Sequence, residues 1–264
     1  MQNFCYINFD HEFPLVAAAI HNGHLVSERL EQISALTETE RLREEDPFTG
    51  KWTKISSNRI IGNFSRFEVD LNRPREKCIY LEPEDAWGLT LWHKKPSIEI
   101  INEILSKYDD FYKQVGSGIM HLLEQFDRIV ILDIHSYNHR RQGPDNPPDD
   151  PEINPEVNIG TGTMDRIYWS AIVDRFLKDL KNFQFFQRSL DVRENVKFKG
   201  GYFSRWIHEN FPQKACCLSI EFKKIFMDEW TGEADGQQVE EIFSALKYTM
   251  PGILEELKNM NQSR

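Results

Sequence analysis

Short apolar runs alternate along this chain with longer segments in which apolar residues recur every three or four positions. An alternation of strand-length and helical patterns is typical of an α/β domain. The runs predict strands over Leu15–Ile20, Phe67–Leu71, Ile129–Ile134 and Cys216–Phe222. The first, third and fourth are almost continuously apolar, as expected of strands that are covered on both faces.

Helical periodicity predicts three helices, over Ile98–Phe126, Met164–Asn182 and Gln238–Asn259. Gly116 is a position where the first of them could break. In the third, the apolar residues form one stripe at three- and four-residue steps, which indicates packing against the core.

A long segment, Asn138–Thr163, is dense in Pro, Asp, Asn and Gly. Loops of this length within a compact domain are usually functional or disordered, and its place directly after the sequence Asp-Ile-His-Ser favours a lid over an active site. The chain shows no internal repeat and no shift of composition, so residues 1–264 are expected to form a single domain.

Charge and apolar content exclude some classes of function. The chain has 264 residues and a formal net charge of −10, with 42 acidic and 32 basic residues. Phosphate binding needs a surplus of Lys and Arg, so nucleic acid is not the expected partner, whereas a few local arginines suffice for a small anionic substrate. No apolar stretch approaches the roughly 20 residues that span a bilayer, and we expect no membrane association and no secretory signal.

The four cysteines do not resemble a disulfide framework. Cys216 and Cys217 are adjacent within an apolar run, where buried thiols are usual, and Cys5 and Cys78 stand alone. A cytoplasmic location is therefore expected.

Ionisable residues stand where the predicted buried strands end. Ile20 is followed by His21, the third strand runs into Asp133-Ile134-His135-Ser136, and Ile220 is followed by Glu221. Ligands of open α/β sheets bind beyond the carboxyl ends of the strands, so these side chains can converge there. Each residue alone is more often structural, but together they are typical of a zinc site with an open position for water and a nearby base.

The sequence is less specific about the orienting group and the third metal ligand of such a site. Asp133 lies two residues before His135, on the same side of the strand, and can orient its imidazole. A third metal ligand could be His24, three residues after His21, or an acid of the Glu45-Asp46 pair. By spacing alone, a solvated charged helix terminus is the favoured interpretation of these acids.

Two further segments carry candidate binding groups. Arg66, Asn72 and Arg73 surround the short predicted strand, and a guanidinium can hold a carboxylate through two parallel hydrogen bonds. A surface ion pair is the alternative for these arginines. Gly200-Gly201 indicates a tight turn or a close approach of backbone to a ligand, and Tyr202 could donate a hydrogen bond to an oxyanion or be a buried structural tyrosine.

In their order along the chain, these motifs resemble those of the N-formylglutamate amidohydrolase family, which is itself related to zinc carboxypeptidases. The resemblance covers about Pro14 to Phe226. The segments that carry it are His21-Asn22-Gly23, Arg43 to Asp46, Asp70-Leu71-Asn72-Arg73, Asp133-Ile134-His135-Ser136, Gly200-Gly201-Tyr202 and Glu221. It implies an α/β fold with a mixed, mostly parallel central sheet and helices on both faces, as in zinc carboxypeptidases.

The resemblance also implies roles for individual residues. His21, His135 and Asp46 would bind one Zn²⁺, although another divalent metal is compatible, and Glu221 would activate water. Asn72 and Arg73 would grip the substrate's α-carboxylate, and Arg66 would polarise the scissile carbonyl or bind a second carboxylate. Ser136 is a further candidate for substrate binding, and Tyr202 is the candidate donor to the oxyanion. One departure is His24, because carboxypeptidases have a glutamate ligand at that spacing.

The expected reaction is hydrolysis of the amide bond of an N-acyl amino acid, most specifically N-formyl-L-glutamate to formate and L-glutamate. Two alternatives stay open. One is a carboxypeptidase-like or other N-acyl amino acid deacylase with the same site and another acyl pocket. The other is a non-catalytic protein that binds acidic ligands through its arginines.

Overall fold

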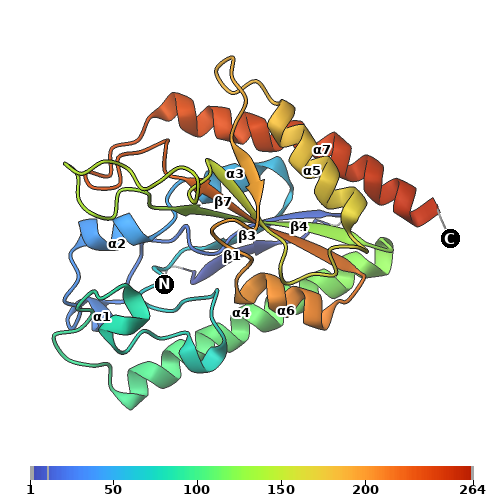
Figure 1. Cartoon of the computed structure of the whole chain (residues 1–264). Coiled ribbons are helices and arrows are strands. Elements are labelled where there is room, and N and C mark those ends of the chain that lie inside the picture. The colour runs from blue at the N-terminus through green and yellow to red at the C-terminus, as the bar shows by residue number, and fades with distance from the viewer. Residues whose placement is uncertain (1–2, 11, 263–264) are drawn as a thin grey trace.

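The computed structural model describes residues 3–10 and 12–262, and a seven-stranded sheet forms the centre of this part of the chain (Figure 1). The strands are β1 (Cys5–Asn8), β2 (Leu15–Ala19), β3 (Asn58–Gly62), β4 (Ile129–Tyr137), β5 (Val157–Gly160), β6 (Val192–Glu194) and β7 (Ala215–Lys223). Their order across the sheet is β1-β3-β2-β4-β7-β5-β6. Only the β1–β3 and β5–β7 pairs of these strands are antiparallel. The predicted mixed, mostly parallel α/β sheet is confirmed.

Helices cover both faces of this sheet. They are α1 (Glu28–Glu31), α2 (Glu38–Glu44), α3 (Thr49–Trp52), α4 (Ile98–Gln125), α5 (Ser170–Asn182), α6 (Tyr202–Asn210) and α7 (Gly236–Gln262), with short 3₁₀ turns at Thr53–Ile55, Arg75–Lys77 and Pro83–Ala86. Helices α4 and α6 lie on one face, and α5 and α7 lie on the other (Figure 1). Among the described residues, no helix is long and apolar enough to cross a membrane.

The central strands are apolar on both sides because each side meets a helical layer. In β4, Ile129 and Ile131 pack toward α4 and α6, whereas Val130, Leu132 and Ile134 pack toward α5 and α7. Successive side chains of a strand point to opposite faces, so a continuous apolar run fills both cores.

The face that carries α4 and α6 turns polar toward the carboxyl ends of the two central strands. After Ile131 the next residues on that side of β4 are Asp133 and His135, and after Cys217 on β7 they are Ser219 and Glu221. His135 and Glu221 are direct partners in the parallel β4–β7 register. The sheet itself therefore places an imidazole and a carboxylate side by side.

One predicted strand is wrong. Phe67–Leu71 forms turns, because the Ser65 carbonyl accepts the N–H groups of Glu68 and Val69, at 2.9 and 3.3 Å, and the Asp70 carboxylate accepts the N–H of Asn72 at 2.8 Å. The alternating apolar residues of this segment are buried by loop packing rather than by a sheet. The strand in this region is β3, which begins nine residues earlier along the chain.

The predicted helices and the long loop need smaller corrections. Helix α4 runs unbroken through Gly116, and α5 begins at Ser170 rather than at Met164, since the preceding residues form a turn. The expected loop Asn138–Thr163 is interrupted by β5 at Val157–Gly160, so its long irregular part runs only from residue 138 to residue 156. All four cysteines are free, as expected.

Candidate functional site

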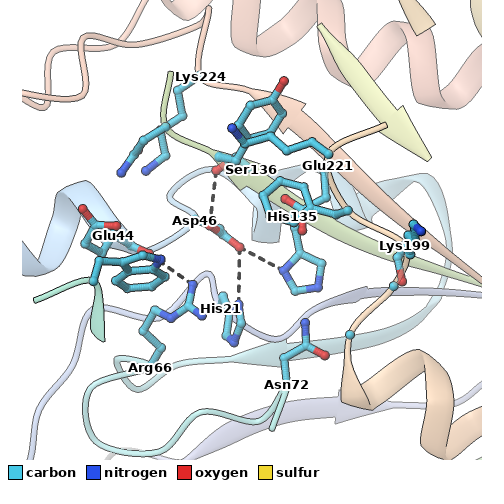
Figure 2. Close-up of a pocket in the computed structure, with 18 of the residues that line it drawn as sticks. His21, Glu44, Asp46, Arg66, Asn72, His135, Ser136, Lys199, Glu221 and Lys224 are labelled. Carbon is cyan, nitrogen blue, oxygen red and sulfur yellow. Dashed lines mark hydrogen bonds and ion pairs between the residues drawn. The ribbon is translucent and has the colours of Figure 1, made fainter. Parts of the chain in front are cut away.

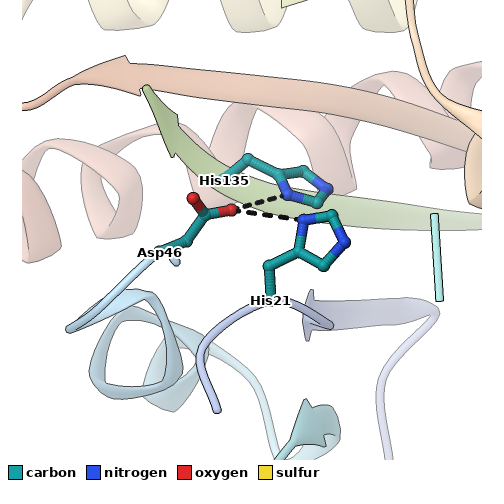
Figure 3. A group of neighbouring side chains, drawn as sticks. All are labelled: His21, Asp46 and His135. Carbon is teal, nitrogen blue, oxygen red and sulfur yellow. Dashed lines mark hydrogen bonds and ion pairs between the residues drawn. The ribbon is translucent and has the colours of Figure 1, made fainter. Parts of the chain in front are cut away.

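Three side chains from separate elements converge beside the sheet (Figure 3). His21 follows β2, Asp46 follows α2, and His135 stands on β4. Their ligand atoms all lie within 4.8 Å of one another, and Asp46 Oδ2 lies 2.9 Å from His135 Nδ1 and 3.5 Å from His21 Nδ1. The backbone N–H of Asp46 donates to the His21 carbonyl at 3.0 Å, which fixes the loop that carries the carboxylate.

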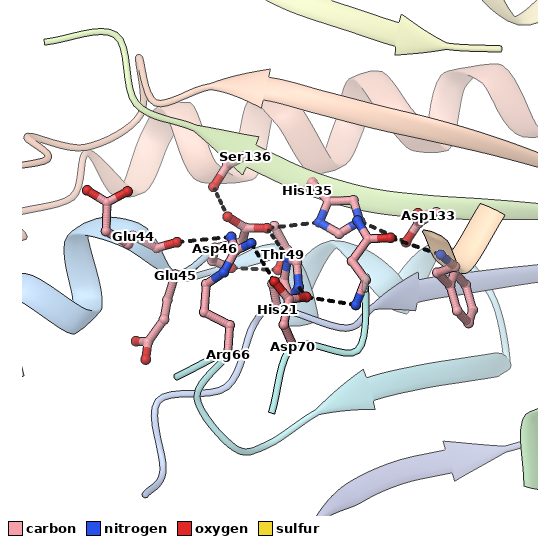
Figure 4. A network of polar contacts seen from close by, with 12 residues as sticks. His21, Glu44, Glu45, Asp46, Thr49, Arg66, Asp70, Asp133, His135 and Ser136 are labelled. Atoms are coloured by element: carbon pink, nitrogen blue, oxygen red, sulfur yellow. Dashed lines mark hydrogen bonds and ion pairs between the residues drawn. The ribbon is translucent and has the colours of Figure 1, made fainter. Parts of the chain in front are cut away.

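Buried carboxylates hold the far side of each imidazole (Figure 4). His21 Nε2 lies 2.7 Å from Asp70 Oδ1, and His135 Nε2 lies 2.9 Å from Asp133 Oδ1. With the Nε2 protons donated to these acids, both Nδ1 atoms are free to act as acceptors toward the centre of the group. Carboxylates of this kind fix the ring orientation and the tautomer of metal-binding histidines. The contact that would let Asp133 orient the His135 imidazole is thus present, and Asp70 makes the equivalent contact with His21.

The group suits a zinc ion by its chemistry. Imidazole nitrogen and carboxylate oxygen are ordinary Zn²⁺ ligands at about 2.0–2.2 Å, and three protein ligands leave a coordination position open in catalytic sites. All three side chains are almost fully buried. A metal in a buried site of three such ligands is held by preformed geometry, so the residues present fit the ion that the resemblance implies.

The electrostatics of the group are those of a site built for a cation. Burial raises the pKa of Asp46, but the adjacent His135 and His21 outweigh it and hold that pKa well below its ordinary range. Burial raises the pKa of Glu221 to about 8, and the nearby Asp46 and Asp133 carboxylates act in the same direction. Three acids thus lie close together, with Asp46 and Asp133 buried and Glu221 half-buried beside them, an arrangement that a divalent cation would stabilise.

A cavity of about 360 Å³ opens over this group (Figure 2). Of the residues singled out in the sequence, those that line it are His21, Asp46, Arg66, Asn72, His135, Ser136, Gly200, Gly201 and Glu221. Arg66 is anchored by the Asp70 carboxylate at 3.0 Å, and the Ser136 hydroxyl lies 3.5 Å from Asp46. The fold therefore brings most of the predicted site together.

Arg73 and Tyr202 lie outside the cavity wall. The Arg73 guanidinium donates to the Asp85 carbonyl at 2.6 Å and lies over the Tyr80 ring at 4.3 Å. Tyr202 begins α6 and packs its ring against Tyr112, with centroids 5.9 Å apart. The contacts of these two side chains are those of structural residues, so the geometry does not support the substrate-binding and catalytic roles expected for them.

The alternatives for the third ligand are separated in space. His24 Nδ1 bonds to the Glu45 carboxylate, which also accepts the Ser65 hydroxyl, and His24 Nε2 faces Glu38 at 3.3 Å. His24 and Glu45 thus use each other as partners, whereas Asp46 faces both histidines. The geometry favours Asp46 as the ligand.

Four basic residues of the cavity wall were missed by sequence reasoning: Arg141, Lys197, Lys199 and Lys224. Lys224 is 1% exposed, and burial lowers the pKa of its ammonium to about 8. Its Nζ donates to the carbonyls of Arg43 and Glu45, at 2.5 and 2.8 Å, at the C-terminal end of α2, where a cation is favoured. This contact has no signal in the sequence, because Lys224 and its partners at the end of α2 are about 180 residues apart.

At the cavity wall, the backbone of Gly201 packs directly against the side chain of Asn72. A Cβ on Gly201 would lie 2.2 Å from Asn72 Oδ1, and that oxygen accepts the N–H of Phe203 at 2.9 Å. The close approach predicted from the paired glycines is therefore made to Asn72, and it holds this amide at the cavity wall.

Replacing Gly201 with alanine is expected to displace Asn72 and to lower kcat/KM by about 10- to 100-fold, since misplacement by about 1 Å can cost that much. Steady-state kinetics would measure the change. Gly236→Ala is the control, because a Cβ there meets no atom within 4 Å. Equal kinetics in the two variants would contradict the positioning of Asn72 by Gly201.

The fold and the site together define an α/β protein with a candidate metal centre beneath a cavity at the carboxyl ends of its central strands. The family model of N-formylglutamate amidohydrolase matches residues 13–227. The chain therefore belongs to the N-formylglutamate amidohydrolase family, as the motifs indicated, and this is a family of hydrolases. No curated protein sequence matches the chain.

Solved structures agree with this fold. The N-formylglutamate amidohydrolase from Ralstonia eutropha JMP134 matches with a TM-score of 0.68 and 15% identity, covering 95% of each chain. The gene product Atu2144 from Agrobacterium tumefaciens also matches with a TM-score of 0.68, at 16% identity, covering 96% of each chain. At these identities the matches support the fold alone.

Proposed function

We propose that this protein hydrolyses the amide bond of N-acyl amino acids, with N-formyl-L-glutamate as its substrate and formate and L-glutamate as products. The observation that carries the proposal is the buried His21–Asp46–His135 group with Glu221 beside it under one cavity. The family match supports the reaction class.

We propose that His21, Asp46 and His135 hold one Zn²⁺. Bound there, the ion would supply Lewis-acid chemistry, lowering the pKa of water toward about 7 and polarising a carbonyl. Asp70 and Asp133 would keep both Nδ1 atoms directed at the ion through their bonds to Nε2.

Glu221 is the proposed proton carrier. Its carboxylate lines the cavity and stands next to His135 on the neighbouring strand. A cation in the group would favour its ionised form, against the effect of burial. Glu221 would then accept a proton from the attacking water and return it to the leaving amine.

Arg66 and Asn72 are the proposed groups that bind and orient the substrate. The Arg66 guanidinium is fixed by Asp70 and by the Glu44 carbonyl, at 3.0 and 3.3 Å, and would donate to the oxygen on which charge develops. Asn72 would donate its amide to the substrate's carboxylate. Arg73, which points elsewhere, is not part of this proposal.

Purified protein supplied with zinc is expected to release formate and glutamate in equal amounts from N-formyl-L-glutamate. Dialysis against a chelator should abolish the release, and zinc should restore it. Zinc-loaded protein that turns over no N-acyl amino acid would contradict the proposal and favour a binding protein for acidic ligands.

A deacylase of longer acyl groups is the second candidate. A neighbouring cavity of about 220 Å³ shares Glu44, Trp87, Asn138 and Arg141 with the first, so the site has room beyond a formyl group. A kcat/KM that rises with acyl length would favour this candidate over the first.

A further inference from the structure

We propose that Arg141 determines specificity by binding the side-chain carboxylate of the substrate. This inference rests on the proposed function, because it assumes that the substrate is an amino-acid derivative held over the His21–Asp46–His135 group. Arg141 lies in the irregular segment after β4 and lines both the main cavity and the neighbouring one.

The Arg141 guanidinium is held in place before any ligand arrives. Its NH2 and NH1 atoms donate to the two carboxylate oxygens of Glu44, at 3.0 and 3.4 Å, and its Cζ lies 5.1 Å from the centre of the Trp87 ring. Arg43 Nε also reaches Glu44, at 3.4 Å. A guanidinium fixed by a carboxylate and an aromatic face loses little freedom when it binds a ligand.

The Arg141–Glu44 ion pair leaves positive charge uncompensated and N–H donors of Arg141 unused. Glu44 is shared by two guanidiniums, so one acid faces two cations. Arginine has five N–H donors, and within the described residues Arg141 spends its donors on Glu44 alone. The remaining donors can bind a carboxylate, which is the natural partner of this planar group.

Trp87 links this position to the reacting end of the cavity. The Cζ atoms of Arg66 and Arg141 lie 5.0 and 5.1 Å from the centroid of its ring. The residue adopts a left-handed backbone conformation, with φ of 54°, which is unusual for a large side chain and is retained where the surroundings require it. Because Arg66 is proposed to face the reacting oxygen and Arg141 shares the same indole, a small substrate held at Arg66 can present its side-chain carboxylate to Arg141.

The other cations of the cavity wall are less suited to this role. Arg66 is bound to Asp70, Lys197 to the Asn154 side chain, and Lys224 to two carbonyls. Lys199 is exposed, and no partner of its ammonium is found in the described part of the chain. Lys199 is therefore the other residue that could bind the side-chain carboxylate, and the experiment must distinguish its effect from that of Arg141.

The test is calorimetric binding of L-glutamate and L-glutamine to the zinc-supplemented protein, together with kinetics on their N-formyl derivatives. Arg141→Met is expected to weaken L-glutamate binding by about 10- to 100-fold, as the loss of charged hydrogen bonds does, and to leave L-glutamine binding nearly unchanged. Arg141→Lys should retain part of the preference.

Arg140→Met is the matched control, since it removes the adjacent positive charge. The Arg140 guanidinium bonds to the carbonyls of Pro144 and Asn146, at 2.6 and 3.4 Å, and lines neither cavity. The preference for glutamate over glutamine should survive this change.

Three results would overturn the inference. They are a wild-type protein that binds both amino acids equally, an Arg141→Met variant that weakens both equally, and a loss of preference in Lys199→Met with the preference intact in Arg141→Met. A wild-type protein that prefers L-glutamate through Arg141 but turns over no N-formyl derivative would refute the proposed function and support this inference.

Discussion

Glu221→Gln is expected to lower kcat by about 10²- to 10⁴-fold, the usual contribution of a positioned acid–base group. The amide keeps the size of the side chain but cannot take a proton from water. Because Glu221 is not among the three candidate metal ligands, the variant should bind zinc as the wild-type protein does. Steady-state kinetics and metal analysis of the same preparations would measure both quantities.

Glu68→Gln is a suitable control for this change, because it also removes a buried carboxylate. Glu68 bonds to the backbone N–H of Ser27 at 2.6 Å and to Lys107 at 2.5 Å, and it does not line the cavity. It should lower stability and leave kcat close to that of the wild type. Full activity in Glu221→Gln would remove Glu221 from the mechanism.

His135→Ala is expected to abolish both zinc binding and turnover, since it deletes a candidate ligand and removes the imidazole that contacts both Asp46 and Asp133. Asp133→Asn, which disturbs only the far side of the same ring, should weaken zinc binding by about 10- to 100-fold. Equilibrium zinc titration of the purified variants would measure this order of effects.

His24→Ala distinguishes a ligand from a neighbouring histidine. Its ring is engaged by Glu45 and Glu38, so the variant should keep stoichiometric zinc and most of the activity. Loss of zinc in His24→Ala, with zinc retained in Asp46→Asn, would assign the third ligand to His24 and reject the group inferred from the geometry.

The residues that the sequence could identify are those with a local signal. His135 and Glu221 interrupt runs that are otherwise apolar, and a strand keeps alternate residues on one face, so the pattern alone places them together. The same pattern misled at Phe67–Leu71, because alternating apolar residues can be buried by turns as well as by a sheet.

Side chains on loops could not be placed in this way. Arg66 and Arg73 are indistinguishable by pattern, and both contact Asp70 and Tyr80. Arg66 nevertheless lines the cavity, whereas Arg73 donates to the Asp85 carbonyl and does not line it. Arg141 stands in a long irregular segment, and its partner Glu44 is 97 residues away. Long-range contacts of this kind leave no periodic trace in a single sequence.

The pairing of His135 with Glu221 across β4 and β7 has a consequence for how such a protein can change during evolution. Hydrogen-bonded strands keep a spacing of about 4.8 Å whatever the loops do, so the distance between these two groups is set by backbone alone. Arg141, Asn72 and Lys199 lie outside the strands. Mutations or insertions in the loops that carry these three residues could therefore recruit a new substrate while His135 and Glu221 keep their spacing, so the choice of substrate and this part of the chemistry can be inherited separately.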